Sequence, residues 1–210
     1  MNDLFEFALL AFTSLFTMIN PLGVVPVYIS LTSKLTPAEA KKVAYKSILT
    51  ALVVLLIFAV TGKFIFDFFA ISVNSLKVVG GVIFFMTGYD MLQARLIRTK
   101  ESSESDVEYS NDISITPLGI PLICGPGAIT VSIVMMNEAS FLAEKAVLLF
   151  IIVLVLSIAL VFLLSARKIM HALGNNGNKV LMRIMGLIVM VIAVEFLFSG
   201  LKPLVKNLLN

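Results

Sequence analysis

Two helix-breaking stretches interrupt long apolar segments of the sequence: Asn20-Pro21-Leu22-Gly23 and Gly125-Pro126-Gly127-Ala128. Proline lacks a backbone N–H and glycine costs backbone entropy in a helix, so both residues break or weaken helices. Pro21 and Pro126 are 105 residues apart in a chain of 210, which places the breaks at matching positions of two halves. We therefore expect two broken helices in a chain made of two related halves.

The composition is typical of an integral membrane protein. Hydrophobic residues make up 59% of the chain and charged residues 14%, and the mean hydropathy is +1.03. A soluble domain of this length cannot bury so much apolar surface, so the lipid bilayer is the expected environment. The net charge of +3 comes from Lys and Arg that flank the apolar runs, which gives no reason to expect nucleic-acid binding. The lone Cys124 excludes an intramolecular disulfide, and with His171 as the single histidine we expect no metal site or cofactor.

Apolar runs of about 20 residues, the length that crosses a bilayer as a helix, predict six spans. They are Leu4–Leu31, Ala44–Phe66, Leu76–Leu96, Ile115–Met136, Ala146–Leu164 and Val180–Leu201. The second has a clear start, because Thr36-Pro37-Ala38-Glu39 is a capping box with proline at the first helical position. Residues 98–112, rich in Ser, Glu and Asp, are interpreted as a polar cytoplasmic linker between two units, residues 1–97 and 113–210.

The two halves match at an offset of 105 residues, which superposes the first three spans on the last three. The matched pairs include Pro21 with Pro126, Lys63 with Lys168, Gly81 with Gly186, and Asp90 with Glu195. An odd number of spans in each half requires the second half to enter the bilayer from the opposite side. The predicted fold is an all-α integral membrane protein of two inverted three-helix repeats, with the first and fourth helices broken at the membrane midplane.

The distribution of Lys and Arg predicts the orientation. If the loops after the first, third and fifth spans face the cytoplasm, they gather 11 of the 16 basic residues. Cytoplasmic loops of membrane proteins carry such an excess. We expect a multi-pass protein of the cell's inner (plasma) membrane with both termini on the extracytoplasmic side.

The chemistry of the breaks predicts a ligand site. Asn20 and Gly125 are favoured N-cap residues, and each is followed by proline at the first helical position. A break inside the membrane leaves N–H and C=O groups without helical partners, so it must line a cavity enclosed by protein. The N-terminus of the new half-helix suits a carboxylate, and the freed carbonyls suit an ammonium group. The expected partner is a small zwitterion.

The candidate substrate-binding residues are those of the two breaks and two nearby hydroxyls. They are Thr17, Asn20, Pro21, Leu22, Gly23, Gly125, Pro126, Gly127 and Thr130. For each hydroxyl, the alternative role is a hydrogen bond to a carbonyl of its own helix. For the breaks, the alternative is a pair of proline kinks that ease helix packing without binding any ligand.

Both breaks, with their flanking residues, resemble the paired signatures of a known family. The sequences Asn20-Pro21-Leu22-Gly23-Val24-Val25-Pro26 and Pro121-Leu122-Ile123-Cys124-Gly125-Pro126-Gly127-Ala128-Ile129-Thr130 look like those of the MarC family, and the resemblance covers the whole chain. That family includes SnatA-type small neutral amino acid transporters and is distantly similar to the LysE amino acid exporters. The resemblance implies transport of small neutral amino acids such as glycine or alanine, with protons as a possible coupling ion and the two broken helices forming the site.

Asp90 and Glu195 lie inside predicted spans, and acids within the membrane are candidates for function. Either is a candidate carrier of a coupled proton. At 3.6 residues per turn, Asp90 lies about 180° around its helix from Gly81, and Glu195 lies at the same angle from Gly186. If the glycine faces pack against other helices, the acids point away from them. The alternative role is structural or interfacial pairing.

The leading interpretation is a secondary transporter that works by alternating access around a midplane site. The chain has no Walker A pattern, no G-x-S-x-G elbow and no HExxH motif, so we expect neither ATP drive within this chain nor enzymatic activity. The alternatives are a drug or metabolite efflux protein and a non-transporting membrane stress-response factor. The exact substrate, import or export, the coupling ion and the oligomeric state stay open.

Overall fold

A computed structural model describes residues 2–93 and 112–209, and in this part of the chain every regular element is a helix. In chain order the elements are α1 (Asn2–Ile19), α2 (Pro21–Leu31), α3 (Pro37–Phe68), α4 (Val73–Leu92), η1 (Ser114–Ile123), α6 (Pro126–Glu138) and α7 (Leu142–Leu209). The prediction of an all-helical protein is confirmed. Most of the predicted linker, residues 98–112, lies outside the described residues.

The helices are long and apolar enough for five or six membrane spans. Five spans meet the length and hydropathy expected of a crossing helix, and η1 with α6 makes a sixth if this bent pair counts as one. Helix α7 contains two of the spans, Leu142–Ile169 and Lys179–Lys206, which we call its N-terminal and C-terminal arms. Gly174 separates the arms with φ 65° and ψ 178°, a conformation that glycine adopts without a steric penalty.

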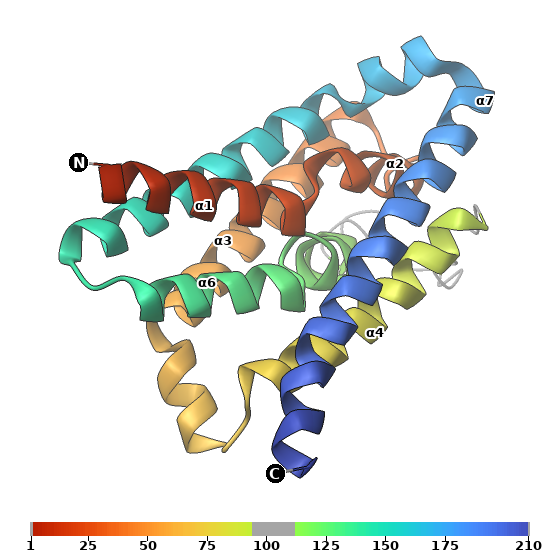
Figure 1. Cartoon of the computed structure of the whole chain (residues 1–210). Coiled ribbons are helices and arrows are strands. Elements are labelled where there is room, and N and C mark those ends of the chain that lie inside the picture. Colours follow the sequence, from red (N-terminus) through yellow and green to blue (C-terminus); the bar gives the residue numbers. More distant parts are fainter. Residues whose placement is uncertain (1, 94–111, 210) are drawn as a thin grey trace.

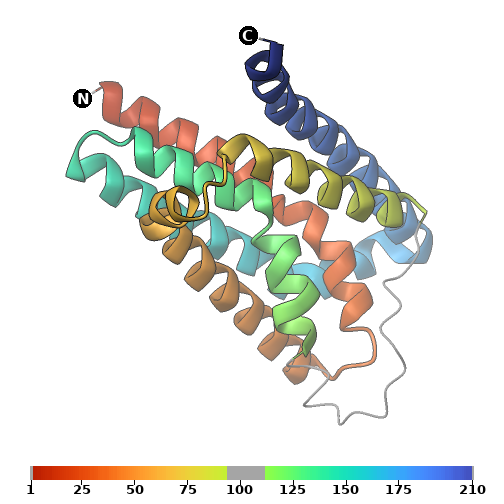
Figure 2. The ribbon, with the colours of Figure 1, turned by 90° about the horizontal axis from the view of Figure 1, so that it is seen from below.

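The connections alternate between two ends of the helix bundle. The N-terminus and the α6–α7 turn lie at the left of Figure 1, and the C-terminus and the α3–α4 turn lie at its bottom; we call this end of the bundle the termini side. The α2–α3 turn and the bend of α7 lie at the opposite end, the Gly174 side, and Figure 2 shows the same separation from below. This arrangement is the one that successive spans of a multi-pass membrane protein require.

The start of α3 is as the sequence predicts. The Thr36 hydroxyl accepts a hydrogen bond from the N–H of Glu39 (3.3 Å), and the Glu39 carboxylate accepts one from the N–H of Thr36 (2.9 Å). Pro37 follows as the first helical residue. Helix α3 therefore starts seven residues before Ala44, where the predicted span begins. The prediction followed the apolar run, which marks only the part of a helix inside the bilayer, and the helix itself extends further.

Glycines bring α4 and the C-terminal arm of α7 into close contact. A Cβ on Gly81 would lie 2.8 Å from the carbonyl oxygen of Ala193, and a Cβ on Gly88 would lie 2.8 Å from the carbonyl oxygen of Gly186. Backbones approach this closely only where small residues line the interface. The α4 glycines thus serve helix packing, as their sequence positions suggest.

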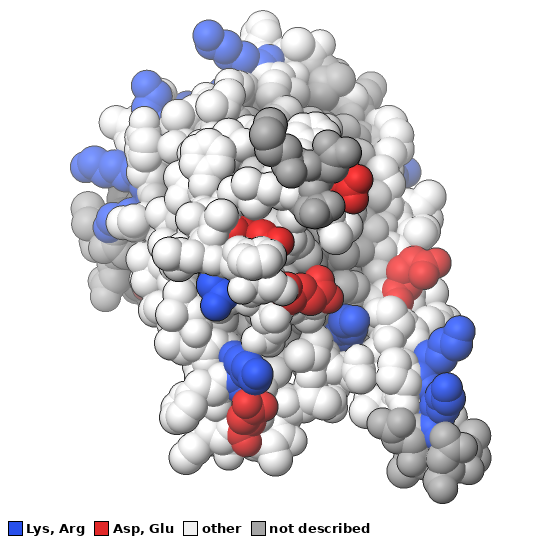
Figure 3. Space-filling view, turned by 60° about the vertical axis from the view of Figure 1, so that its left-hand side comes forward, with Lys and Arg blue, Asp and Glu red and all other residues white. Residues whose placement is uncertain are grey.

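The outer surface of the bundle is apolar. Large side chains such as Phe64, Phe68 and Phe150 are more than 60% exposed, while Leu15, Leu118 and Ile152 are fully buried between helices. Figure 3, which looks toward the left-hand side of Figure 1, shows few charged groups, with acidic and basic side chains interspersed on a mostly uncharged surface. Many large exposed apolar side chains are expected where lipid is the solvent.

Candidate functional site

The first break separates α1 from α2 at a single residue. Asn20 takes the left-handed conformation (φ 47°, ψ 64°), which asparagine tolerates better than most residues. Its Oδ1 accepts a hydrogen bond from the N–H of Gly23 (3.2 Å), so Asn20 caps α2 and Pro21 is the first helical residue, as predicted. Both helices still form one apolar span, Leu4–Leu31, so the break is local.

The second break is larger and differs from the prediction. The segment before it, η1, has π-type turns and extended backbone at Thr116 (φ −130°, ψ 126°) and Ile120 (φ −130°, ψ 125°), where an α-helical half was expected. The cause is Pro117 and Pro121, because the ring of a proline pushes the preceding residue out of the helical region. Helix α6 starts at Pro126 and makes an angle of 56° with η1.

The N-terminus of α6 has no side-chain cap. Gly125 holds the N-cap position as predicted, with φ −78° and ψ 169°, but glycine has no side chain to accept a hydrogen bond. The first N–H groups of a helix have no partner within that helix. The positive end of α6 is therefore free of the local capping group that Asn20 supplies to α2.

Phe84 of α4 covers this uncapped helix end. A Cβ on Gly125 would lie 2.6 Å from Cε1 of Phe84, and a Cβ on Gly127 would lie 3.2 Å from Cε2 of the same ring. A Cβ on Gly127 would also lie 2.8 Å from the sulfur of Met18, two residues before the first break. Because Gly125 and Gly127 have no side chains, the Phe84 ring fits against the second break. For the same reason Met18, beside the first break, packs against Gly127 of the second.

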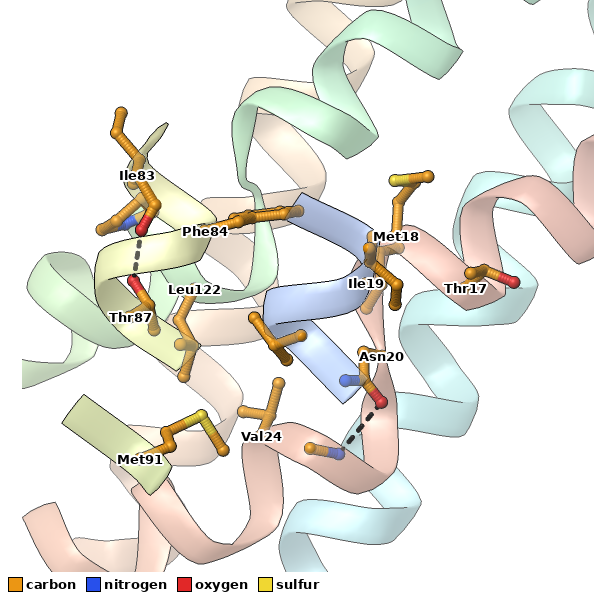
Figure 4. A pocket seen from close by; sticks show the side chains of 14 residues that line it. Thr17, Met18, Ile19, Asn20, Val24, Ile83, Phe84, Thr87, Met91 and Leu122 are labelled. Carbon is orange, nitrogen blue, oxygen red and sulfur yellow. Dashed lines mark hydrogen bonds between the residues drawn. The ribbon is translucent and has the colours of Figure 1, made fainter. Parts of the chain in front are cut away.

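A small cavity, which we call the central cavity, lies beside the first break, between α1, α2, α4, η1 and the C-terminal arm of α7 (Figure 4). Its volume is about 30 Å³, room for about one water molecule. Side chains from both halves line it: Thr17, Met18, Ile19, Asn20, Gly23, Val24, Ile83, Phe84, Thr87, Met91, Pro121, Leu122, Val189 and Ile192. The lining is mostly apolar.

Three predicted site residues line the central cavity: Thr17, Asn20 and Gly23. The Nδ2 of Asn20 is buried and has no hydrogen-bond partner within the described part of the chain, which leaves a donor available to a ligand. The Thr17 hydroxyl donates to the carbonyl of Thr13 (2.7 Å) and points away from the other lining side chains in Figure 4. Thr17 therefore has the helix-bonding role that the sequence leaves as its alternative.

The other predicted site residues do not line the central cavity. Pro21 is buried within α2, and Leu22 is 44% exposed on the outside of the bundle. The side chain of Pro126 contacts α4 instead, because a Cβ on Gly80 would lie 2.7 Å from its Cβ. Gly125 and Gly127 lie behind Phe84, and Thr130 lines a different cavity on the termini side.

Phe84, Thr87 and Met91 line the central cavity and were missed by sequence reasoning. All three lie on one face of α4 with Gly80 and Gly88, at spacings of three and four residues. That face was interpreted only as a packing surface. Their position on the glycine face is the sequence signal that could have identified these three residues. Small residues bring two helices together, so the larger residues on the same face lie near the centre of the bundle.

Asp90 and Glu195 lie apart, and both are exposed, away from the packed glycine faces as their helical angle predicts. Asp90 lines a cavity of about 80 Å³ toward the Gly174 side, which shares Thr87, Met91, Pro121 and Leu122 with the central cavity. The predicted span runs to Leu96, but α4 ends at Leu92, so Asp90 lies in its last turn.

Comparisons with known proteins identify the chain's relatives. Residues 5–205 match the family model described as MarC family integral membrane protein. A UPF0056 membrane protein of Methanocaldococcus jannaschii is 37% identical over 198 residues, covering 94% of this chain and 97% of the relative. The UPF0056 membrane protein YvbG of Bacillus subtilis is 34% identical over 202 residues, covering 95% and 96%. No solved structure matches the chain.

Proposed function

The chain belongs to the MarC family of integral membrane proteins, and we propose that it is a secondary transporter of small neutral amino acids such as glycine or alanine. The observation that carries the proposal is that the two helix breaks lie close together inside the bundle, beside a small cavity that Asn20 and Gly23 of the first break line. Transporters place substrate sites at such breaks, where backbone groups are available to a ligand. The amino acid class comes from the resemblance to SnatA-type transporters.

The lining of the central cavity supports two inverted repeats. Residues 105 positions apart line it in pairs: Thr17 with Leu122, Phe84 with Val189, and Thr87 with Ile192. Residues related in this way surround a common point when the two halves are related by a pseudo-two-fold axis. Such an axis in the membrane plane allows the two halves to open the same site toward either side.

The packing of α4 against α7 supports the same symmetry. Gly81 of α4 contacts Ala193 of α7. The counterparts of these two residues at the offset of 105 are Gly186 and Gly88, and they also contact each other. Two independent contacts thus obey the offset that the sequence predicts. The corresponding helices of the two halves form the centre of the proposed transporter.

The closed central cavity implies that binding requires a movement. Its 30 Å³ is too small for an amino acid, and the Phe84 ring occupies the space beside Gly125 and Gly127. We infer that α4 carries Phe84 away from the N-terminus of α6 when substrate enters. Movement of one helix relative to a fixed site is the type of change that alternating access needs.

The hydrogen-bonding groups at the two breaks indicate how the substrate would lie. Its carboxylate would accept hydrogen bonds from the N–H groups at the start of α6 and from the Nδ2 of Asn20. Its ammonium would lie near carbonyls of η1, where the extended Thr116 and Ile120 interrupt the helical hydrogen bonds. The close packing around Gly125 and Gly127 favours a small side chain.

If transport is coupled to protons, Asp90 is the better candidate of the two acids. Its cavity adjoins the central cavity, whereas Glu195 is exposed on the C-terminal arm of α7. An acid beside the substrate path can exchange a proton as the path opens. The separation of Asp90 from Glu195 gives no support for joint acid–base catalysis, so we propose no enzymatic role.

We propose that the termini side is extracytoplasmic, in the inner (plasma) membrane. Lys63, Lys77, Lys145, Lys202 and Lys206 belong to that side, and the other 11 of the 16 basic residues belong to the loops of the opposite side or to the linker. A reporter fused after Asn210 that is active only outside the cytoplasm is expected to be active. Activity of a reporter that works only in the cytoplasm would reverse this orientation.

A thermal-shift screen of the purified protein against the amino acids tests the proposed function. Heating exposes the buried Cys124, the only cysteine of the chain, so a thiol-reactive dye reports unfolding. Glycine or alanine at 100 times its Kd should stabilise the fold by about 2.7 kcal/mol, roughly 5–10 °C for a chain of this size. Acetate and methylamine, each with one of the two charges, serve as controls. Equal shifts with all of these compounds, or none, would contradict the proposal.

A further inference from the structure

A second cavity, which we call the termini-side cavity, has a volume of about 280 Å³. It lies between α1, α4, α6 and the C-terminal arm of α7, and its polar side chains are Ser14, Lys77, Thr130, Glu138 and Ser199. Unlike the central cavity, it has room for a small organic molecule in the present conformation.

Thr130 provides the first sign that this cavity binds a ligand. The residue is 2% exposed, and its Oγ1 has no hydrogen-bond partner within the described part of the chain. By contrast, the Ser132 hydroxyl, on the same helix and fully buried, donates to the carbonyl of Ala128 (2.8 Å). Leaving a buried hydroxyl without a partner costs about 1–3 kcal/mol, so a partner outside the chain is expected at Thr130.

Lys77 and Glu138 provide the second sign, because the cavity holds one charge of each sign. Neither residue has an ion-pair partner among the residues that the structure describes. A Cβ on Gly200 would lie 3.0 Å from the Cβ of Lys77, so α7 packs closely against α4 at this residue. Two charges of opposite sign that line one cavity match a ligand that carries both charges itself.

We propose that the termini-side cavity is a binding site for a free α-amino acid. Lys77 binds the carboxylate, Glu138 binds the ammonium group, and the Thr130 hydroxyl donates a hydrogen bond to the carboxylate. The cavity adjoins the proposed transport path, because Phe196 lines it and contacts Phe84 of the central cavity, with ring centroids 6.5 Å apart. That this ligand is also the transported molecule rests on the proposed function. That an amino acid binds in this cavity does not.

A zwitterionic lipid headgroup offers the same pair of charges, but the position of the cavity favours a free amino acid. The Phe84–Phe196 pair lies between the two cavities, so a molecule bound here is one aromatic contact away from the central cavity. A lipid held here would block that route.

Protection of an introduced thiol tests the proposal. Replacing Cys124 by alanine removes the only cysteine, and Ser14→Cys then introduces a thiol in the termini-side cavity of the full chain. In nanodiscs of phosphatidylcholine, we expect glycine to slow modification by a methanethiosulfonate reagent at least threefold. Acetate and methylamine at the same concentration should not. Ser199→Cys is the second reporter if Ser14→Cys does not fold.

Variants in this background identify the groups that bind. Thr130→Val keeps the shape of the side chain and should raise the glycine concentration needed for half-maximal protection about tenfold. Lys77→Gln and Glu138→Gln should each abolish protection. Ser132→Ala, the matched control on the same helix, should leave protection unchanged. Protection that survives Thr130→Val and both charge variants would overturn the proposal, as would no protection at either reporter.

Two further results separate this proposal from its alternatives. Protection by added phosphatidylethanolamine in place of glycine would overturn the proposal in favour of a lipid site. Glycine protection in a protein that does not transport glycine would refute the proposed function and leave this site in place. Glycine transport without protection of either thiol would overturn the proposed site and leave the proposed function in place.

Discussion

The two helix breaks each have an N-cap residue followed by proline, but their structures differ. At the first, Asn20 folds back and caps α2 with its own side chain, and the span continues as Leu4–Leu31. At the second, the helix end has no cap, the chain bends by 56°, and the ring of Phe84 from α4 covers the opening. One break is thus closed by its own residue and the other by a side chain from a different helix.

In the proposed transporter, we expect this difference to decide which break receives the ligand. A cap from the same turn moves with its helix, so the first break stays closed while α2 stays folded. The cover of the second break belongs to α4, so the proposed shift of α4 would remove it. We therefore expect the first break to supply the fixed Nδ2 donor of Asn20 and the second to supply the helix end that opens and closes.

The largest expected effect comes from alanine at Gly125, the N-cap glycine of the second break. At Gly125 a Cβ would lie 2.7 Å from the carbonyl oxygen of Pro121 and 2.6 Å from the Phe84 ring. The backbone oxygen cannot move away without disturbing η1, so Gly125→Ala should destabilise the fold by roughly 3 kcal/mol. The apparent melting temperature, followed through Cys124, should fall by about 6–12 °C.

Gly23→Ala is the matched variant at the first break. Its Cβ would lie 2.4 Å from the Nδ2 of Asn20, an atom at the end of a side chain that can turn away. Losing the cap costs about 1 kcal/mol, and alanine recovers part of this within the helix. The melting temperature should therefore fall by less than about 4 °C. A larger loss for Gly23→Ala than for Gly125→Ala would contradict the comparison.

A smaller effect is expected at the acids of the two halves. Asp90→Asn should keep glycine exchange but lower accumulation driven by a pH gradient at least threefold, because its cavity adjoins the central cavity. Glu195→Gln, on the exposed face of α7, should leave both unchanged. Both are measured in proteoliposomes with and without a pH gradient. Full accumulation by both variants would exclude these acids as proton carriers.

Much of the fold follows from local sequence signals. The positions of the breaks, the N-cap residues Asn20 and Gly125, and the capping box at Thr36 are all present as predicted. These features depend on interactions between residues within one helical turn of each other, so they can be predicted from a short stretch of sequence. The glycine packing of α4 also follows, because small residues leave few other roles on a buried helix face.

The site could be predicted only in part, because it depends on which helices meet. Phe84 lies more than 40 positions from either break, and no local pattern shows that its ring covers Gly125. Thr130 lies one helical turn after Pro126, but it faces the termini-side cavity instead of the central one. Sequence distance from a break therefore does not say which cavity a side chain lines.

Exchange of radiolabelled glycine in proteoliposomes tests the central claim most directly, with Asn20→Asp beside the unaltered protein. The substitution keeps the Oδ1 that caps α2 and removes the unpaired Nδ2 donor. Since a hydrogen bond to a charged group contributes about 1.5–3 kcal/mol, glycine exchange should be at least about tenfold weaker than in the unaltered protein. Ser132→Ala, away from the central cavity, should exchange normally. Equal exchange by Asn20→Asp and the unaltered protein, or no exchange above empty liposomes, would contradict the account.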